Sequence, residues 1–403
     1  MSVPKLRFKE FDGDWFQSKI GEIFQVTSGS TPLRSDNRFF ENADIAWVKT
    51  TDLNNGLIEK TEEKISQIAL KETSVKILPK GTVFVAMYGG FNQIGRTGLL
   101  VHEAACNQAL SAIYPNEKID SYFLLTFLNH KVDDWKNFAA SSRKDPNITK
   151  SDVLAFPLKY PVKEEQTKIA FFLSAVDEKI SQLTQKHELL SQYKQGMMQK
   201  LFSQQIRFKA DDGSEFGEWE EVALSKVSDV RDGTHDSPSY VKDGYPLITS
   251  KNLKNGKLDL TDINLISEDD YLNINKRSAV NIGDIIFGMI GTIGNPVLLN
   301  SDGFAIKNVA LIKEKDELLN IYLIHYLNSS FFAKQVALLN AGNTQKFLAL
   351  GQNRSLSIHK PQLAEQTKIA NFLSAIDQKI EVVAQRIEQA KTWKKGLLQQ
   401  MFV

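Results

Sequence analysis

Residues 165–202 read EQTKIAFFLSAVDEKISQLTQKHELLSQYKQGMMQKLF, and residues 365–402 read EQTKIANFLSAIDQKIEVVAQRIEQAKTWKKGLLQQMF. Half of these 38 aligned positions are identical, and most of the others exchange similar side chains, as Tyr193 and Trp393 do. The two stretches are offset by 200 residues without a gap. An internal repeat of this length indicates that one structural unit occurs twice in the chain.

The repeat continues outside these stretches, although more weakly. Leu6–Lys9 (LRFK) returns as Ile206–Lys209 (IRFK), and Val48–Gly56 (VKTTDLNNG) returns as Ile248–Gly256 (ITSKNLKNG). Between such matches the halves differ widely, so each copy is a variable region followed by a nearly constant segment. The sequence therefore predicts a first variable domain at 1–160, a first constant helix at 161–203, a second variable domain at 204–360 and a second constant helix at 361–403.

Apolar residues in both constant segments recur at alternating steps of four and three. This is the heptad spacing of a coiled coil, and no proline interrupts either run. A helix of this length would extend for about 57 Å. The predicted seam comprises Ile169, Leu173, Val176, Ile180, Leu183 and Leu190 in the first segment and Ile369, Leu373, Ile376, Ile380, Val383 and Ile387 in the second.

Three arrangements could bury such a seam: packing on a globular core, pairing between two chains, or pairing within one chain. Two matched helices in one chain pair most economically with each other, and the region between them is long enough for an antiparallel return. We therefore expect an intramolecular antiparallel coiled coil. Lys194 and Lys394 fall in the seam, where a bare charge is costly, and they indicate a wet end or a contact with another molecule.

The variable regions combine strand-like and helical runs. Gly81–Tyr88 and Ile282–Ile290 are typical of strands, whereas Ser121–His130 and Leu318–Ser330 are typical of helices. The expected fold class is thus mixed α/β (α+β), with two globular domains separated by the two long helices and an internal twofold repeat.

Polar loops containing glycine recur at matching places in the two variable regions. Short polar side chains and isolated cations can bind DNA phosphates and recognise base edges. One such loop is most simply a turn, but four loops that recur with different residues fit interchangeable recognition surfaces better. The candidate DNA-binding residues are Thr31, Arg34, Lys49, Thr50, Asn92, Gln93, Arg96 and Arg143 in the first region and Arg231, Thr234, His235, Lys251, Asn252, Asn343, Gln345 and Lys346 in the second.

Catalytic and metal-binding motifs are weak. Gly90–Thr97 nearly matches a phosphate-binding loop, but Arg96 stands where that pattern requires lysine. His102 and Cys106 are four residues apart, but two ligands are too few for a zinc site. We therefore expect no catalytic residue, metal or cofactor in this chain.

Composition narrows the class further. The chain has 49 basic and 48 acidic residues, so any DNA binding must come from a local basic surface or from a partner. No run of 18 apolar residues occurs, and the charged, aromatic start at Met1–Trp15 is unlike a secretion signal. With a single cysteine, these features lead us to expect a cytoplasmic protein without a membrane span.

Two divergent regions, each followed by an EQTKIAxFLSAxDxKI helix, resemble the specificity subunit of type I restriction–modification enzymes. The openings Leu6–Trp15 and Ile206–Trp219 and the loops Ser28–Pro32 and Asp232–Pro238 also match the family style, although the first loop lacks the histidine of the second. The resemblance implies that each variable region is a target recognition domain for one half of a gapped, asymmetric site in double-stranded DNA. It also implies that the chain directs adenine methylation and restriction without catalysing either.

The same resemblance implies partners. Two modification subunits, which bind S-adenosylmethionine, would dock on the helices and the domains. Two restriction subunits, which use ATP and Mg²⁺, would complete the nuclease. The alternatives are a stand-alone dimeric DNA-binding or scaffold protein that self-associates through the coiled coil, and an enzyme in its own right, against which the missing cofactor loop argues.

Overall fold

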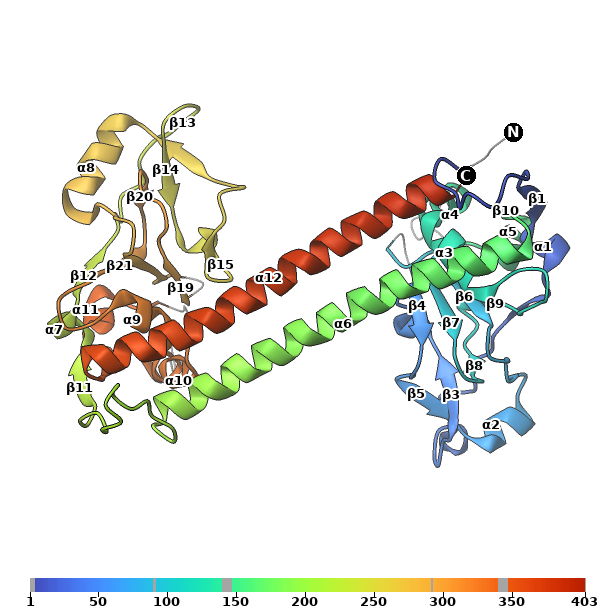
Figure 1. Cartoon of the computed structure of the whole chain (residues 1–403), viewed down its shortest axis with the longest axis horizontal. Helices are drawn as coiled ribbons and strands as arrows, with labels where there is room; N and C mark the ends of the chain where they lie inside the picture. The colour runs from blue at the N-terminus through green and yellow to red at the C-terminus, as the bar shows by residue number, and fades with distance from the viewer. Residues whose placement is uncertain (1–3, 90–91, 140–146, 291–292, 340–346, 403) are drawn as a thin grey trace. The chain divides into compact units, whose positions relative to one another are not determined.

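The computed structural model describes residues 4–89, 92–139, 147–290, 293–339 and 347–402 (Figure 1). Contacts divide the chain into unit 1, residues 1–184 with 385–403, and unit 2, residues 185–384. The division falls inside both long helices, so each unit holds one variable region, the beginning of one long helix and the end of the other.

Unit 1 is built from short strands and helices. The strands are β1 (Phe16–Lys19), β2 (Val26–Ser28), β3 (Ile45–Val48), β4 (Gly56–Ile58), β5 (Glu63–Ile65), β6 (Val83–Ala86), β7 (Thr97–Leu100), β8 (Ala105–Cys106), β9 (Leu110–Ile113) and β10 (Pro157–Tyr160). The helices are α1 (Ile20–Ile23), η1 (Asn37–Phe39), η2 (Thr50–Asp52), α2 (Gln67–Glu72), α3 (Ser121–His130), α4 (Val132–Ala139), α5 (Lys150–Ala155) and the start of α6 (Lys163–Phe202).

Unit 2 has the same mixed composition. Its strands are β11 (Glu220–Ala223), β12 (Asp229–Asp232), β13 (Tyr240–Val241), β14 (Tyr245–Ile248), β15 (Leu253–Lys254), β16 (Lys257–Leu258), β17 (Asn264–Ile266), β18 (Ile285–Gly288), β19 (Gly294–Leu298), β20 (Ala305–Ile306), β21 (Val309–Lys313) and β22 (Ser357–Lys360). Its helices are α7 (Leu224–Val227), η3 (Ser250–Asn252), α8 (Glu268–Ser278), α9 (Asn320–Leu327), α10 (Ser330–Leu339), α11 (Leu350–Arg354) and most of α12 (Leu363–Met401).

The strand order repeats between the units. The order β2-β9-β6-β7 in unit 1 matches β12-β21-β18-β19 in unit 2, and β5-β3-β8 matches β17-β14-β20. In the second of these matched orders the last pair of strands is parallel in both units, with Trp47 opposite Ala105 and Leu247 opposite Ala305. The predicted mixed α/β class is confirmed, and the two divergent sequences share these strand orders, although β4 extends the first order in unit 1 and β13 extends the second order in unit 2.

In each unit, the beginning of one long helix packs beside the end of the other. Ile169 and Leu173 of α6 share the unit 1 core with Phe402, whose ring lies 5.9 Å from that of Phe127. In unit 2 the core contains Phe202, at the end of α6, together with the start of α12. Full burial of such a side chain contributes about 1.5–3 kcal/mol, so the helix ends belong to the domain cores.

The predicted seam residues face inward. Those that are buried are Ile169, Leu173, Val176, Ile369, Leu373, Ile376, Val383 and Ile387, and those that are half-buried are Ile180, Leu183, Leu190 and Ile380. The structure gives the two seam lysines a different explanation from the wet end or outside contact that we expected. Nζ of Lys194 lies 2.6 Å from Asp377, and Nζ of Lys394 lies 2.5 Å from Asp177, so each lysine meets a carboxylate of the other helix.

The repeated LRFK and IRFK motifs have the same structural role. The Arg7 guanidinium donates to both carboxylate oxygens of Glu165, at 2.8 and 2.7 Å, and Arg207 does the same to Glu365, at 3.1 and 2.7 Å. Both glutamate side chains are fully buried near the start of a long helix. These charge-assisted pairs tie the segment before each domain to the helix that follows that domain.

Candidate nucleic-acid interface

The first polar loop of unit 1 leaves the end of β2 through a glycine. A Cβ on Gly29 would lie 2.2 Å from the carbonyl oxygens of Cys106 and Asn107, so only glycine fits. The Ser30 amide then donates to the Cys106 carbonyl at 3.0 Å, and the Thr31 hydroxyl donates to the side chain of Gln108. The predicted contact residue Thr31 is therefore held at the surface by the neighbouring turn.

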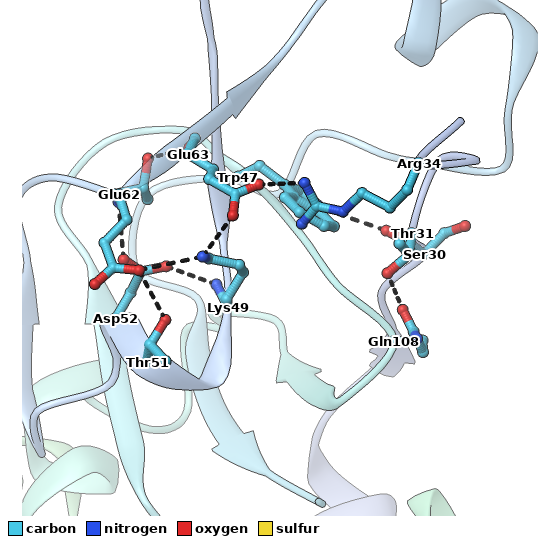
Figure 2. Close-up of polar contacts among 11 residues, drawn as sticks. Ser30, Thr31, Arg34, Trp47, Lys49, Thr51, Asp52, Glu62, Glu63 and Gln108 are labelled. Atoms are coloured by element: carbon cyan, nitrogen blue, oxygen red, sulfur yellow. Dashed lines mark hydrogen bonds and ion pairs between the residues drawn. The ribbon is translucent and has the colours of Figure 1, made fainter. Parts of the chain in front are cut away.

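Arg34 is restrained from three sides (Figure 2). Its Nη1 lies 2.6 Å from a carboxylate oxygen of Glu63, and its guanidinium lies 4.8 Å from the Phe40 ring centre and 5.0 Å from that of Trp47. The side chain is still 53% exposed. A guanidinium fixed by an ion pair and two rings loses little freedom on binding, and this suits recognition of a planar group.

Glu63 also binds Lys49, so one carboxylate bridges two of the predicted DNA-binding cations (Figure 2). Nζ of Lys49 lies 2.7 Å from Glu63 and 3.1 Å from Glu62. Hydrogen bonds from Arg34 and then from Lys49 lower the pKa of the Glu63 carboxyl. The Asp52 carboxylate accepts the Lys49 amide at 2.7 Å and the Glu62 amide at 2.9 Å, which fixes this loop around half-buried Thr50.

The remaining predicted residues of unit 1 lie elsewhere. Asn92, Gln93 and Arg96 follow β6 at the turn into β7, where Asn92 is exposed and the other two are half-buried. Arg143 lies outside the described residues, as do Asn343, Gln345 and Lys346 of the second copy. The structure therefore brings Thr31, Arg34, Lys49 and Thr50 into one loop cluster and places the β6–β7 turn on a different strand pair.

The equivalent loop of unit 2 has the same construction with other side chains. A Cβ on Gly233 would lie 2.4 Å from the Ile306 carbonyl oxygen, and the Thr234 amide donates to that oxygen at 3.0 Å. His235 follows, with Nδ1 2.8 Å from the side-chain oxygen of Asn308. Thus Thr234 and His235 occupy the positions that Ser30 and Thr31 hold in unit 1.

Asn252 was predicted to contact DNA, and the structure gives it a different role. It is 2% exposed, and its Nδ2 donates to the carbonyls of Asp259 and Asp262 at 3.0 and 3.2 Å. Its side-chain oxygen accepts the Thr249 amide at 3.0 Å. Because every polar atom of this amide is used inside the loop, Asn252 has a structural role, equivalent to that of Asp52, instead of a base contact.

Arg231 and Lys251, the other predicted cations of unit 2 that the structure describes, also have acidic neighbours. Arg231 binds Asp229 at 2.6 Å, and hydrogen bonding to that carboxylate raises the pKa of the guanidinium. Lys251 lies 3.4 Å from Asp262. Arg277, in the last turn of α8, is a further cation that the loop pattern does not predict; it binds Asp232 and lies beside His235 in a surface pocket. No glycine loop marks it, and its proximity depends entirely on the fold.

Side chains that commonly bind metals do not gather in threes in the part of the chain that the structure describes. Within those residues, no three His, Cys, Asp or Glu side chains are placed to hold a metal ion. Burial raises the pKa of the Cys106 thiol to about 12, which leaves it protonated and unreactive near neutral pH. Among the same residues, no helix has both the length and the apolar character needed to cross a bilayer.

This repeated scaffold with variable loops defines a class of protein. The family described as type I restriction modification DNA specificity domain matches residues 12–192 and again residues 217–392, and the chain belongs to this family. Among curated proteins, it is 26% identical over 424 aligned positions to the type I restriction enzyme MjaVIII specificity subunit of Methanocaldococcus jannaschii, covering 97% of this chain and 94% of that one.

Another curated protein and two solved structures are also similar to this chain. The specificity subunit of EcoR124I/EcoR124II from Escherichia coli is 24% identical over 182 positions, or 45% of each chain. The crystal structure of a type I restriction–modification S subunit from M. genitalium has the same fold, with a TM-score of 0.65 and 16% identity over 100% of this chain and 99% of that one. A chain from a type I system solved in a study of complex assembly matches with a TM-score of 0.58 and 18% identity, covering 97% and 98% of the two chains.

Proposed function

We propose that this chain is the subunit that sets the DNA sequence at which a type I restriction–modification complex acts, and that it catalyses neither methylation nor cleavage itself. Family membership over both halves supports the role. The names of the relatives point to the same role, since they are specificity subunits. One observation carries the proposal: the strand order of unit 1 recurs in unit 2, while the side chains on its loops change.

Each unit would recognise one half of a gapped, asymmetric site. Unit 1 offers Thr31, Arg34, Lys49 and Thr50 on one loop cluster, with Asn92, Gln93, Arg96 and Arg143 as further candidates. Unit 2 offers Arg231, Thr234, His235 and Lys251, with Asn343, Gln345 and Lys346. Arginine and lysine serve phosphates or guanine, whereas asparagine and glutamine suit adenine, so the two sets favour different half-sites.

The long helices would form an antiparallel coiled coil and carry the partners. Buried seam positions in both helices and the reciprocal pairs Lys194–Asp377 and Lys394–Asp177 support this arrangement. We further propose that two modification subunits with S-adenosylmethionine and two restriction subunits with ATP and Mg²⁺ assemble on the chain. A net charge of +1 fits this assembly, because the partners can supply phosphate contacts, which contribute much of DNA affinity.

The test is to co-express the chain with its cognate modification subunit and to sequence the host DNA for N6-methyladenine. One gapped, two-part methylated motif is expected. Replacing residues 16–160 by the corresponding region of a relative should then change one half of the motif only. A stable complex that methylates no defined motif would contradict the proposal, and a stable homodimer that binds DNA without a modification subunit would favour a stand-alone protein.

A further inference from the structure

Unit 2 contains a polar surface pocket of about 500 Å³ between the loop after β12 and helix α8. The loop contributes His235 and Asp236, and the helix contributes Asp270, Asn273 and Arg277. Of the residues that line the pocket, Thr234 and His235 belong to the loop residues that the sequence marks for DNA binding, and none of those from α8 does. The pocket is therefore a feature of the tertiary structure, formed where α8 meets the recognition loop.

Asp232 contacts two of the residues that line this pocket, His235 and Arg277. Its side chain is 10% exposed, and its Oδ1 accepts a hydrogen bond from Nη2 of Arg277. Its Oδ2 lies 3.0 Å from Nε2 of His235, whose Nδ1 lies 2.8 Å from the side-chain oxygen of Asn308. Each imidazole nitrogen thus lies within hydrogen-bonding distance of an oxygen, and His235 and Arg277 hold the two carboxylate oxygens of Asp232.

Arg277 is bound to Asp232 but remains exposed to solvent. Its side chain is 64% exposed, and both of its contacts with Asp232 use Nη2. A guanidinium has five N–H donors, and the contacts with Asp232 involve only those on Nη2, so the donors on Nε and Nη1 take no part in them. This matches Arg34 of unit 1, which is 53% exposed and is bound to Glu63 through Nη1.

We infer that Arg277, positioned by Asp232, recognises a guanine in the DNA half-site of unit 2, as the counterpart of Arg34 in unit 1. The inference rests on the proposed function and names the base contact of this half. The O6 and N7 atoms of guanine form a pair of acceptors in the major groove that fits the arginine fork. A phosphate fits this pocket less well, because Asp232 offsets the charge of Arg277 and because Asp236 and Asp270 line the same space.

The two arginines come from different elements. Arg34 lies in the loop after β2, whereas Arg277 lies in the last turn of α8, a helix whose unit 1 counterpart, α2, has only six residues. Two guanidinium groups presented from different elements would meet their half-sites at different positions. This provides a physical reason why one scaffold, used twice, can recognise an asymmetric site.

The test is to compare the methylated motifs of the wild-type complex and its variants by sequencing. Arg277→Ala should relax the requirement for guanine at one position of the unit 2 half by about 10- to 100-fold, with the unit 1 half unchanged. Arg277→Lys should relax the same position, because lysine keeps the charge but lacks the fork. Lys276→Ala, which removes the exposed cation next to Arg277 on α8, should leave the motif unchanged.

Other outcomes overturn the inference. If Arg277→Ala lowers methylation equally at all sites and reduces the salt dependence of DNA binding by about one phosphate contact, then Arg277 contacts the backbone. A motif that stays unchanged in both arginine variants, with normal thermal unfolding and complex formation, removes Arg277 from recognition altogether. Failure of the proposed function would look different, since the wild-type complex would itself methylate no two-part motif.

Discussion

Nζ of Lys194, on α6, lies 2.6 Å from Oδ1 of Asp377, on α12. The repeat reproduces this pair with the helices exchanged, since Lys394 of α12 lies 2.5 Å from Asp177 of α6. Each lysine is only 20% exposed at a seam position. A charge at such a position requires a counter-charge, and a shift of one helix along the other would separate the partners. The two pairs therefore favour a single register.

Reversing the charge of Lys194 should destabilise the helix pair. Lys194→Asp places two carboxylates together, so thermal unfolding should begin at a lower temperature. The double variant Lys194→Asp/Asp377→Lys should recover part of the loss, with a coupling energy of about 0.5–1 kcal/mol for a partly exposed pair. As a control, the same exchange at Lys391 and Glu388, an exposed pair within one turn of α12, should have little effect. Additive effects at Lys194 and Asp377 would refute the pairing.

Removing the guanidinium of Arg207 should lower the free energy of unfolding more than the change at Lys194 does. Arg207→Ala leaves the Glu365 carboxylate buried, with the indole N–H of Trp219, 2.9 Å away, as its remaining side-chain donor. Breaking one partner of such a buried pair costs about 3–5 kcal/mol, which chemical denaturation can measure. Lys209 lies two residues after Arg207 and forms an exposed ion pair with Glu215, so Lys209→Ala is the matched control. Equal losses in the two variants would contradict a special role for the buried pair.

Neutralising Glu63 should strengthen non-specific DNA binding by the assembled complex. Glu63→Gln frees Arg34 and Lys49 from a shared carboxylate, so both cations can approach phosphates. The slope of log K against log salt should then steepen by about 0.9 for each new phosphate contact. Glu72→Gln, at a carboxylate 3.2 Å from the Arg38 guanidinium, should leave the slope unchanged. An unaltered slope in Glu63→Gln would show that the carboxylate does not restrain these cations.

The ion pairs of Glu63 should also depend on pH. Because Arg34 and Lys49 lower the pKa of the folded-state carboxyl, these pairs contribute stability above the pKa of the unfolded chain. That contribution should disappear as the pH falls through the lower, folded-state pKa. Comparing the pH dependence of unfolding in wild type and Glu63→Gln would measure it, and identical profiles would contradict the prediction.

The imidazole of His235 should titrate at a raised pKa. Hydrogen bonds with Asn308 and then Asp232 raise the pKa of the ring, although burial and the nearby Arg277 oppose the shift. Stabilisation from the charged ring is therefore complete below the pKa of the unfolded chain and is lost as the pH rises through the folded-state pKa. An NMR titration should show a lower His235 pKa in Asp232→Asn, and no change would mean that the carboxylate does not hold the ring.

Gly233→Ala should disrupt the recognition loop of unit 2. The added methyl would overlap the Ile306 carbonyl at 2.4 Å, so the backbone must move. A methyl group on Gly196, inside α6, would meet no heavy atom within 4 Å beyond its chain neighbours and its own helix backbone, and Gly196→Ala should stabilise the helix by about 0.5–1 kcal/mol. Unfolding and DNA binding of both variants would check the contrast, and a neutral Gly233→Ala would remove the packing argument.

The repeat, the two long helices and their inward-facing residues could be predicted from the amino-acid order alone. These features rest on periodic spacing, and a helix converts a spacing of three and four residues directly into a face. The loop positions were also predictable, because glycine and short polar residues mark turns wherever they occur. Gly29 and Gly233 follow that rule.

The partners of individual side chains depended on the tertiary structure. Lys194 pairs with Asp377, which is 183 residues away in the sequence, and Arg277 pairs with Asp232, which is 45 residues away. The side chain of Asn252 points inward and donates hydrogen bonds within its own loop. No local sequence pattern predicts these contacts, because hydrogen bonds and ion pairs require atoms within about 3 Å in space, whatever their separation along the chain. The amino-acid order thus determines the two scaffolds, while the fold decides which polar groups remain exposed for DNA.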